Sequence, residues 1–146
     1  MALPPQKFRE IVFQILYSHS FNSGSDPDIG NEVIPFMMNE LKVTKRTMVE
    51  ANERMKAALD KQEEVDAEIK EASTEYSFDR ISRVELTILR LGLFEILFDA
   101  GIPPKVAISE AIRLCRKFGT PESADFVNAI LDGIYKKNEQ RQPVAQ

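Results

Sequence analysis

The residue types that most often do chemistry in proteins are scarce in this chain of 146 residues. His19 is the one histidine and Cys115 the one cysteine. A zinc site built from histidine and cysteine needs several such ligands, so we expect no metal site. Cys115 lies on an apolar stripe with no base near it in sequence, which is typical of a small core residue rather than a nucleophile. The adjacent carboxylates Glu63 and Glu64 fall in a run of mixed charge, which is typical of a solvated helix face.

Sequence motifs of common enzyme families are absent as well. The chain contains no G-x-G-x-x-G dinucleotide motif, no P-loop and no G-x-S-x-G nucleophile elbow. It also lacks the alternating strand and helix pattern of a cofactor-binding domain. We therefore expect a protein that is not an enzyme and that uses no cofactor.

A cluster of cations is the first feature that suggests a function. Arg113, Arg116 and Lys117 share one half of an expected helix with Lys105 and Glu110, and Lys7 and Arg9 lie at the beginning of the first helix. Cations of this kind bind phosphates, which dominate nucleic-acid affinity and make it salt-dependent. A solvated basic face explains the first three residues equally well.

Aromatic side chains are the second feature that suggests binding. Phe118 and Phe126 could stack on unpaired RNA bases, although both also fit apolar stripes that normally face a core. Phe13, Tyr17 and Phe21 recur every four residues, opposite the core stripe of the first helix. Either a second helix covers this aromatic strip, or the strip is exposed and docks a partner. The pattern alone leaves both interpretations open.

Composition describes an ordinary globular chain with a bias in charge between its two parts. Hydrophobic residues make up 43% and charged residues 29%, and no apolar run approaches the roughly 20 residues that cross a bilayer. The net charge is −4: residues 1–104 carry 12 basic and 18 acidic residues, and residues 105–146 carry 7 basic and 5 acidic residues. Dedicated nucleic-acid binders are usually basic, so RNA affinity must come from a local patch or a shared complex. A single cysteine and the absence of a signal-peptide pattern favour the cytoplasm.

Helical periodicity runs along most of the sequence. The first helix follows Pro4 and Pro5, and its core stripe consists of Phe8, Ile11, Val12, Ile15 and Leu16. Residues 29–41 are weakly helical. A further helical pattern runs from Met48 to Ile69 with an interruption at Gln62, and a break is expected near residues 73–79.

The C-terminal part contains three stronger helical patterns. Ser82 and Glu85 form a capping box that opens a helix apolar on nearly all sides, which we expect to be the central buried helix. Gly92 inside it predicts a close crossing with another helix. Prolines 103 and 104 start the next helix, which ends near Phe118, and Thr120 is the expected N-cap of the last. The expected buried residues of these last two helices are Ile108, Ala111, Ile112, Cys115 and Phe118, then Phe126, Ile130, Leu131 and Ile134.

Three C-terminal segments and one N-terminal segment carry a family resemblance. Leu89–Glu95 resembles the Leu-Arg-x-x-x-Tyr-Glu helix of the NusB family of bacterial transcription antitermination factors, with Phe94 in the Tyr position. Val106–Ala111 resembles its Val-Ala-Ile-Asn-Glu-Ala segment, with Ser109 in the Asn position. Phe126–Asp132 resembles its Phe-Val-Asn-Gly helix, with Ala129 where the family usually has Gly, and Gln14–Tyr17 resembles its Gln-Ala-Leu-Tyr. The resemblance extends over essentially the full length and implies an all-α fold of two packed helical bundles with about six to seven helices. We expect one NusB-like domain over residues 1–146, with subdomains over about 1–72 and 79–138 and a polar tail over 139–146.

The resemblance also implies a function and two surfaces. Members of the family pair with the small-subunit ribosomal protein NusE and bind boxA RNA within the antitermination complex of RNA polymerase. They thereby support processive transcription and maturation of ribosomal RNA. The implied partner surface maps onto Tyr17, Phe21 and Glu85, which favours the exposed interpretation of the strip that includes Phe13. The implied RNA surface maps onto Lys7, Arg9, Lys117 and Phe126, beside the cations Arg113 and Arg116.

One departure from the family bears on RNA affinity. The family often begins with an arginine-rich run, whereas residues 1–9 contain two basic residues here, Lys7 and Arg9. Fewer phosphate contacts weaken RNA binding and flatten its salt dependence. We therefore expect feeble RNA binding by the chain alone and appreciable binding beside its ribosomal-protein partner, because two linked surfaces act at high effective concentration.

Two other functions remain open from the sequence. NusB-like domains also occur as RNA-binding appendages of ribosomal RNA methyltransferases, although this chain has no cofactor-binding pattern with which to methylate by itself. A helical interaction module without an RNA role, such as a homodimer formed through the aromatic strip, is the other alternative. Replacing Tyr17 with Asp distinguishes this last alternative from an adaptor, since it would convert a dimer to a monomer rather than abolish binding of a partner.

Overall fold

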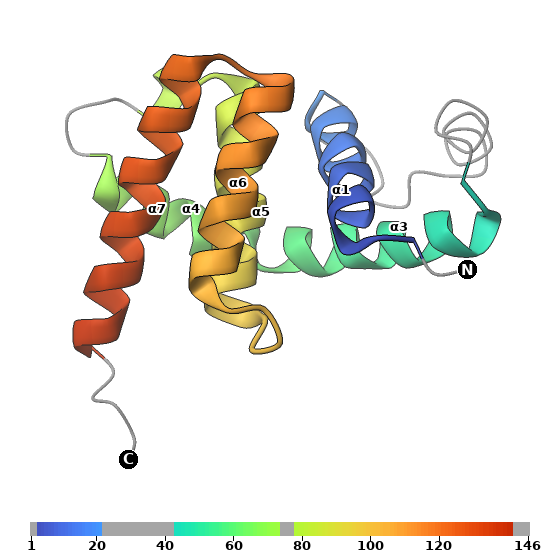
Figure 1. Cartoon of the computed structure of the whole chain (residues 1–146). Coiled ribbons are helices and arrows are strands. Elements are labelled where there is room, and N and C mark those ends of the chain that lie inside the picture. Colours follow the sequence, from blue (N-terminus) through green and yellow to red (C-terminus); the bar gives the residue numbers. More distant parts are fainter. Residues whose placement is uncertain (1–2, 22–42, 74–77, 142–146) are drawn as a thin grey trace. The chain divides into compact units, whose positions relative to one another are not determined.

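The computed structural model describes residues 3–21, 43–73 and 78–141. Within these ranges the chain forms six α-helices, one 3₁₀ helix and no strand (Figure 1): α1 (Pro5–Ser20), α3 (Lys45–Asp60), α4 (Gln62–Ala72), η1 (Phe78–Arg80), α5 (Arg83–Phe98), α6 (Pro104–Phe118) and α7 (Pro121–Arg141). The predicted all-α class is confirmed. The weak helical pattern over residues 29–41 lies outside the described residues. Nowhere in the described ranges is a helix long and apolar enough to span a membrane.

The chain divides into two compact units, residues 1–60 and residues 61–146. This boundary differs from the expected one near residue 72. The periodic pattern over residues 48–69 forms two helices, because α3 ends at Asp60 and α4 begins at Gln62, with Lys61 between them at φ −103° and ψ 6°. Helix α4 belongs to the second unit because it packs against α5 and α7.

The first unit is built on the packing of α1 against α3. The core stripe predicted for α1 is buried at Ile11, Val12, Ile15 and Leu16, whereas Phe8 is half-buried. On α3 the buried apolar side chains are Met48, Ala51, Met55 and Ala58. Interleaved apolar stripes of this kind remove apolar surface from water and hold the two helices together.

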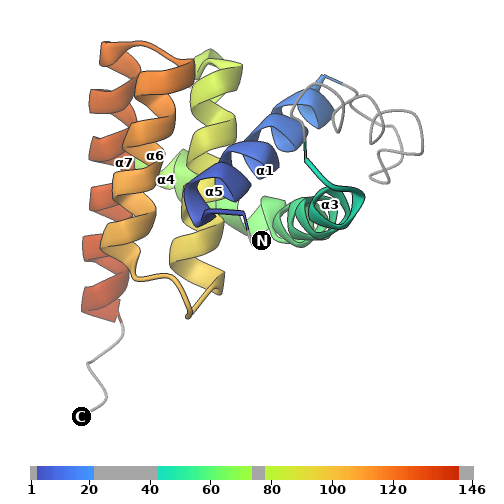
Figure 2. The same cartoon turned by 45° about the vertical axis from the view of Figure 1, so that its right-hand side comes forward.

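Helix α5 is the centre of the second unit, as its apolar sequence predicts. It contacts α4, α6 and α7 (Figure 2), and Ile88, Leu89 and Leu93 are fully buried. The predicted capping box is present. Ser82 Oγ accepts a hydrogen bond from the Glu85 backbone N–H at 3.2 Å, and Glu85 Oε1 accepts one from the Ser82 backbone N–H at 3.2 Å.

Gly92 allows α5 to approach the two C-terminal helices closely. A Cβ atom at this position would lie 3.1 Å from Leu131 Cδ1 on α7 and 3.5 Å from Ala111 Cβ on α6. The first separation is shorter than ordinary van der Waals contact. The close crossing that this glycine predicts is therefore confirmed.

Helices α6 and α7 pack against each other and are joined by Gly119 and Thr120, which we call the α6–α7 corner. Thr120 is the N-cap that the sequence predicts, because its Oγ1 accepts a hydrogen bond from the Ser123 N–H at 3.1 Å. Of the buried residues expected on these helices, Ile112, Phe118 and Phe126 are half-buried and the others are buried. Burial of Ala107, Leu114, Ala124 and Val127 was not predicted.

Candidate functional site

Three aromatic rings on α1 and the turn that follows it form a continuous row, which we call the aromatic ridge (Phe13, Tyr17 and Phe21). The Phe13 and Tyr17 rings stack with centroids 5.9 Å apart, and the Tyr17 and Phe21 rings meet edge to face at 5.0 Å. Exposure increases along the ridge: Phe13 is 2% exposed, Tyr17 is half-buried and Phe21 is 58% exposed. The strip is therefore covered at one end and exposed at the other. Phe13 belongs to the core, and Phe21 leaves a large apolar surface exposed.

Glu85, the fourth residue of the expected partner surface, lies in the second unit at the beginning of α5. Its Oε1 atom accepts hydrogen bonds from the Ser82 N–H at 3.2 Å and from the Ser82 hydroxyl at 2.7 Å. The carboxylate thus caps α5, where a negative charge also interacts favourably with the helix dipole. This structural role exists whether or not a partner reaches the half-buried side chain.

The cations of α6 have unequal environments. Arg113 is held by Glu110, with Nε 3.0 Å from Oε2 and Nη2 3.2 Å from Oε1. Glu110 is buried and Arg113 is half-buried. Arg116 and Lys117 are exposed in the last turn of α6, where positive charge stabilises the helix C-terminus. Arg116 and Lys117 are therefore better placed to meet a phosphate than Arg113.

Aromatic rings accompany these exposed cations at the α6–α7 corner. The ammonium group of Lys117 lies 5.8 Å from the centroid of the Phe118 ring, and Phe118 is half-buried. Phe126, in the second turn of α7, is also half-buried. Figures 1 and 2 show that the beginning of α5, with Glu85, lies at the same end of the second unit. The structure therefore brings Arg113, Arg116, Lys117, Phe126 and Glu85 to one end of this unit.

Lys7 and Arg9 belong to the first unit, on the first two turns of α1, and both are half-buried. The aromatic ridge lies further along the same helix, towards its C-terminal end. The candidate residues thus form two sets, one carried by α1 and one by the α6–α7 end of the second unit.

Cys115 lies within the second unit and is fully buried, as its apolar stripe predicts. Burial, with a smaller contribution from the negative charge of Glu85, raises the pKa of its thiol from the ordinary 9.0 to about 11. The thiol is therefore protonated at neutral pH, whereas nucleophilic attack requires a thiolate. Across the described residues, no group of three or more His, Cys, Asp or Glu side chains is arranged to hold a metal ion.

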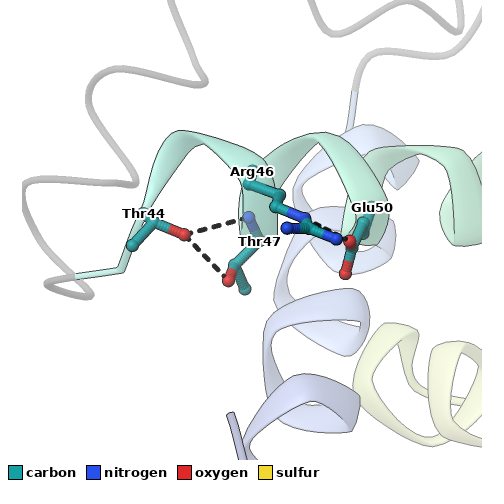
Figure 3. Close-up of polar contacts among 4 residues, drawn as sticks. All are labelled: Thr44, Arg46, Thr47 and Glu50. Atoms are coloured by element: carbon teal, nitrogen blue, oxygen red, sulfur yellow. Dashed lines mark hydrogen bonds and ion pairs between the residues drawn. The ribbon is translucent and has the colours of Figure 1, made fainter. Parts of the chain in front are cut away.

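A cavity of about 770 Å³ in the first unit was not predicted from the sequence. It is open to solvent and is lined from the beginning of α1 by Leu3, Pro5 and Phe8, and from the beginning of α3 by Thr44, Arg46, Thr47 and Glu50. Figure 3 shows the four lining residues of α3 and the residue before it, Thr44, Arg46, Thr47 and Glu50, with their polar contacts. Thr44 Oγ1 accepts a hydrogen bond from the Thr47 N–H at 3.1 Å, and Arg46 Nε lies 3.2 Å from Glu50 Oε1. The spacing of the two threonines is a helix-capping signal, but sequence periodicity does not show that two helix ends meet.

Comparison with known proteins agrees with this arrangement of helices. The NusB family profile matches residues 6–136. The transcription antitermination protein NusB of Chlamydia pneumoniae is 36% identical over 132 residues, which cover 90% of this chain and 80% of that protein. T. maritima NusB has a similar structure, with a TM-score of 0.76 and 29% identity over 97% of this chain and 100% of that chain.

A second solved structure contains both kinds of expected partner. It holds the antitermination factors NusB and NusE in complex with double-stranded RNA, and its matching chain has a TM-score of 0.74 and 27% identity over 90% of this chain and 96% of that chain. The profile match spans more than half of the sequence, and the C. pneumoniae relative is matched over most of its length. The chain therefore belongs to the NusB family.

Proposed function

We propose that this protein is a transcription antitermination factor that pairs with the ribosomal protein NusE and binds boxA RNA of ribosomal RNA operons. The observation that carries the proposal is its similarity to the NusB chain of a complex with NusE and RNA. Membership of the NusB family supports the same function. In this function the protein acts in the cytoplasm as an adaptor and catalyses no reaction.

NusE would bind the exposed part of the aromatic ridge. Large aromatic side chains are enriched at the energetic centres of protein interfaces, because they bury much area with few rotatable bonds. Phe21 presents such a side chain, Tyr17 supports it from one side and adds a hydroxyl group, and Phe13 anchors Tyr17 from the core. Glu85 would contribute a carboxylate to the same partner.

RNA would bind through Arg116, Lys117 and Phe126 at the α6–α7 end of the second unit, with Lys7 and Arg9 adding charge from α1. Exposed cations beside partly exposed aromatic rings suit single-stranded RNA, whose bases stack on rings while its phosphates meet cations. Arg113 would contribute to RNA binding only indirectly, because two of its nitrogen atoms already donate hydrogen bonds to Glu110.

The proposal also explains why RNA affinity should depend on the partner. The chain carries a net charge of −4 and two basic residues in its first nine. Few phosphate contacts give weak binding, whereas RNA held jointly with NusE would bind the second surface at high effective concentration.

Fluorescence anisotropy with labelled boxA RNA tests this function. The titration is run with and without NusE, at two salt concentrations, and with a scrambled RNA of the same length and composition. We expect weak binding by the chain alone and tighter, boxA-selective binding with NusE. Equal affinity for both RNAs in the presence of NusE would contradict the proposal, and so would the absence of NusE binding in a calorimetric titration.

A further inference from the structure

The outward side of α6 carries cations in its first turn and along its C-terminal half. The side chains there are Lys105, Val106, Ser109, Arg113, Arg116 and Lys117, all exposed except the half-buried Arg113. In α6, described in full from Pro104 to Phe118, the one acidic residue is Glu110, which is buried and paired with Arg113. We call this outward side the basic face of α6.

Helical geometry aligns the two ends of this face. Lys105 and Arg116 are eleven residues apart, which places them within about 20° of each other around the axis and about 16 Å apart along it. Ser109 lies between them on the same side of the helix. The basic face is therefore a straight strip that connects the α6–α7 corner with the opposite end of α6.

The adjacent helix α7 is acidic where it begins. Its first two turns contain Glu122 and Asp125, both exposed, and no basic residue. Further along the helix, carboxylates and cations are mixed, and Lys136 is paired with Asp132, with Nζ 2.9 Å from Oδ2. A polyanion that binds at the corner would be repelled by the beginning of α7 and attracted along α6.

Lys105 lies where local helix energetics disfavour a cation. It is in the first turn of α6, next to the partly positive end of the helix dipole, and this turn contains no acidic residue to compensate. A charged residue that is unfavourable for the stability of its own helix often has a functional role, such as binding a ligand.

We infer that the sugar-phosphate backbone of single-stranded RNA runs along the basic face of α6, from the corner at Arg116 and Lys117 to Lys105. This inference rests on the proposed function and adds a second segment to its RNA site. Lys105 would contact a phosphate outside the boxA core, so the protein would bind nucleotides that flank the core without reading their sequence.

We call this path of the RNA backbone along the basic face of α6 the track. Lysine-to-glutamine variants and RNAs of two lengths test it, in the presence of NusE. One RNA holds the boxA core, and the other is extended at both ends by unstructured nucleotides that reach at least about 16 Å beyond it. K105Q is compared with K136Q, a matched variant of an exposed lysine on α7, and with K105R, which keeps the charge. Circular dichroism melts confirm that all variants are folded.

With the extended RNA, K105Q is expected to reduce the slope of log affinity against log salt by about 0.7, the value for one phosphate contact on a single strand. K136Q and K105R should retain the wild-type slope, and K105Q should behave as wild type with the core RNA. Equal slopes for K105Q and K136Q on the extended RNA would overturn the track while leaving the proposed function intact. If the wild-type protein with NusE does not select boxA, the proposed function fails and the track fails with it.

Discussion

Arg90 on α5 and Asp66 on α4 form a bidentate ion pair that joins two helices of the second unit. Arg90 Nε lies 2.8 Å from Asp66 Oδ1, and Nη2 lies 2.9 Å from Oδ2. The side chains are 22% and 17% exposed, so the pair is screened little by solvent. Arg90 belongs to the Leu-Arg motif that resembles the NusB family, and its partner shows what the motif arginine does here: it attaches α4 to the central helix.

Breaking this pair should destabilise the second unit. Arg90→Ala leaves the carboxylate of Asp66 mostly buried without its partner, which we expect to cost about 2 kcal/mol in the free energy of unfolding. Urea denaturation followed by circular dichroism measures the change. Arg46→Ala is the control, because Arg46 and Glu50 are 89% and 54% exposed and should contribute less than about 0.5 kcal/mol. If both substitutions lower the free energy of unfolding equally, the Arg90–Asp66 pair contributes no more to stability than an exposed ion pair.

Two glycines of the second unit should respond oppositely to alanine. Gly92→Ala places a Cβ 3.1 Å from Leu131 Cδ1, a fully buried side chain with little room to move, and should destabilise the protein by about 1 kcal/mol. Gly133→Ala meets no atom within 4 Å and should stabilise α7 by up to about 1 kcal/mol through helix propensity. Thermal melts of both variants measure the difference. A stabilised Gly92→Ala protein would show that the helix crossing is loose.

The aromatic ridge should control partner binding. Tyr17→Asp puts a charge between two rings and should weaken NusE binding by at least about 2 kcal/mol, as for a central interface residue. Val49→Asp is the control, since Val49 is an exposed apolar residue on α3 and not one of the ridge residues. Isothermal titration calorimetry gives both affinities. Light scattering tests the alternative function, because conversion of a dimer to a monomer by Tyr17→Asp would identify the ridge as a self-association surface.

Arg113 and Arg116 should have separable roles despite their proximity. Arg113→Gln removes the partner of buried Glu110 and should lower stability by about 2 kcal/mol, while the salt dependence of RNA binding stays unchanged. Arg116→Gln should lower stability by less than about 1 kcal/mol, because it loses only the interaction with the helix dipole, and should reduce the salt slope by about 0.7. Anisotropy titrations over a salt series, together with urea denaturation, separate the two effects. A reduced salt slope in the Arg113 variant would mean that RNA displaces Glu110.

Cys115 should make stability fall at high pH. Burial raises the pKa of its thiol from 9.0 to about 11, so the unfolded chain loses this proton at a lower pH than the folded protein. The contribution of Cys115 to stability is therefore complete below pH 9 and is lost as the pH rises towards 11. The difference in unfolding free energy between wild type and Cys115→Ala, measured from pH 8 to pH 11, isolates this effect. A difference that does not change with pH would contradict the burial of the thiol.

Features encoded by neighbouring residues were predictable from the sequence. The Ser82–Glu85 capping box, the Thr120 cap and the Gly92 crossing each follow from residue types at fixed spacing, and the structure contains all three. The pairing of Glu110 with Arg113 also has such a spacing, i and i+3, although the position of Arg113 on the helix equally groups it with the other cations of α6.

Features that depend on contacts between distant segments were less accessible. The periodicity of α1 places Phe13, Tyr17 and Phe21 on one side but does not show that burial decreases from the first to the last. Likewise, a helical pattern over residues 48–69 does not show that the chain turns at Lys61, because apolar spacing continues through the turn. The cavity beside Phe8 and Thr47 depends on two helix ends that approach each other in space.

Terminator read-through in a bacterial transcription extract depleted of this protein shows whether the protein acts in antitermination. Templates carry a boxA element or a scrambled element upstream of a terminator, and purified protein and NusE are added back. We expect wild-type protein to increase read-through on the boxA template but not on the scrambled template, and Tyr17→Asp to do so much less than Val49→Asp. Equal read-through on both templates, or none above the depleted extract, would contradict the proposed function.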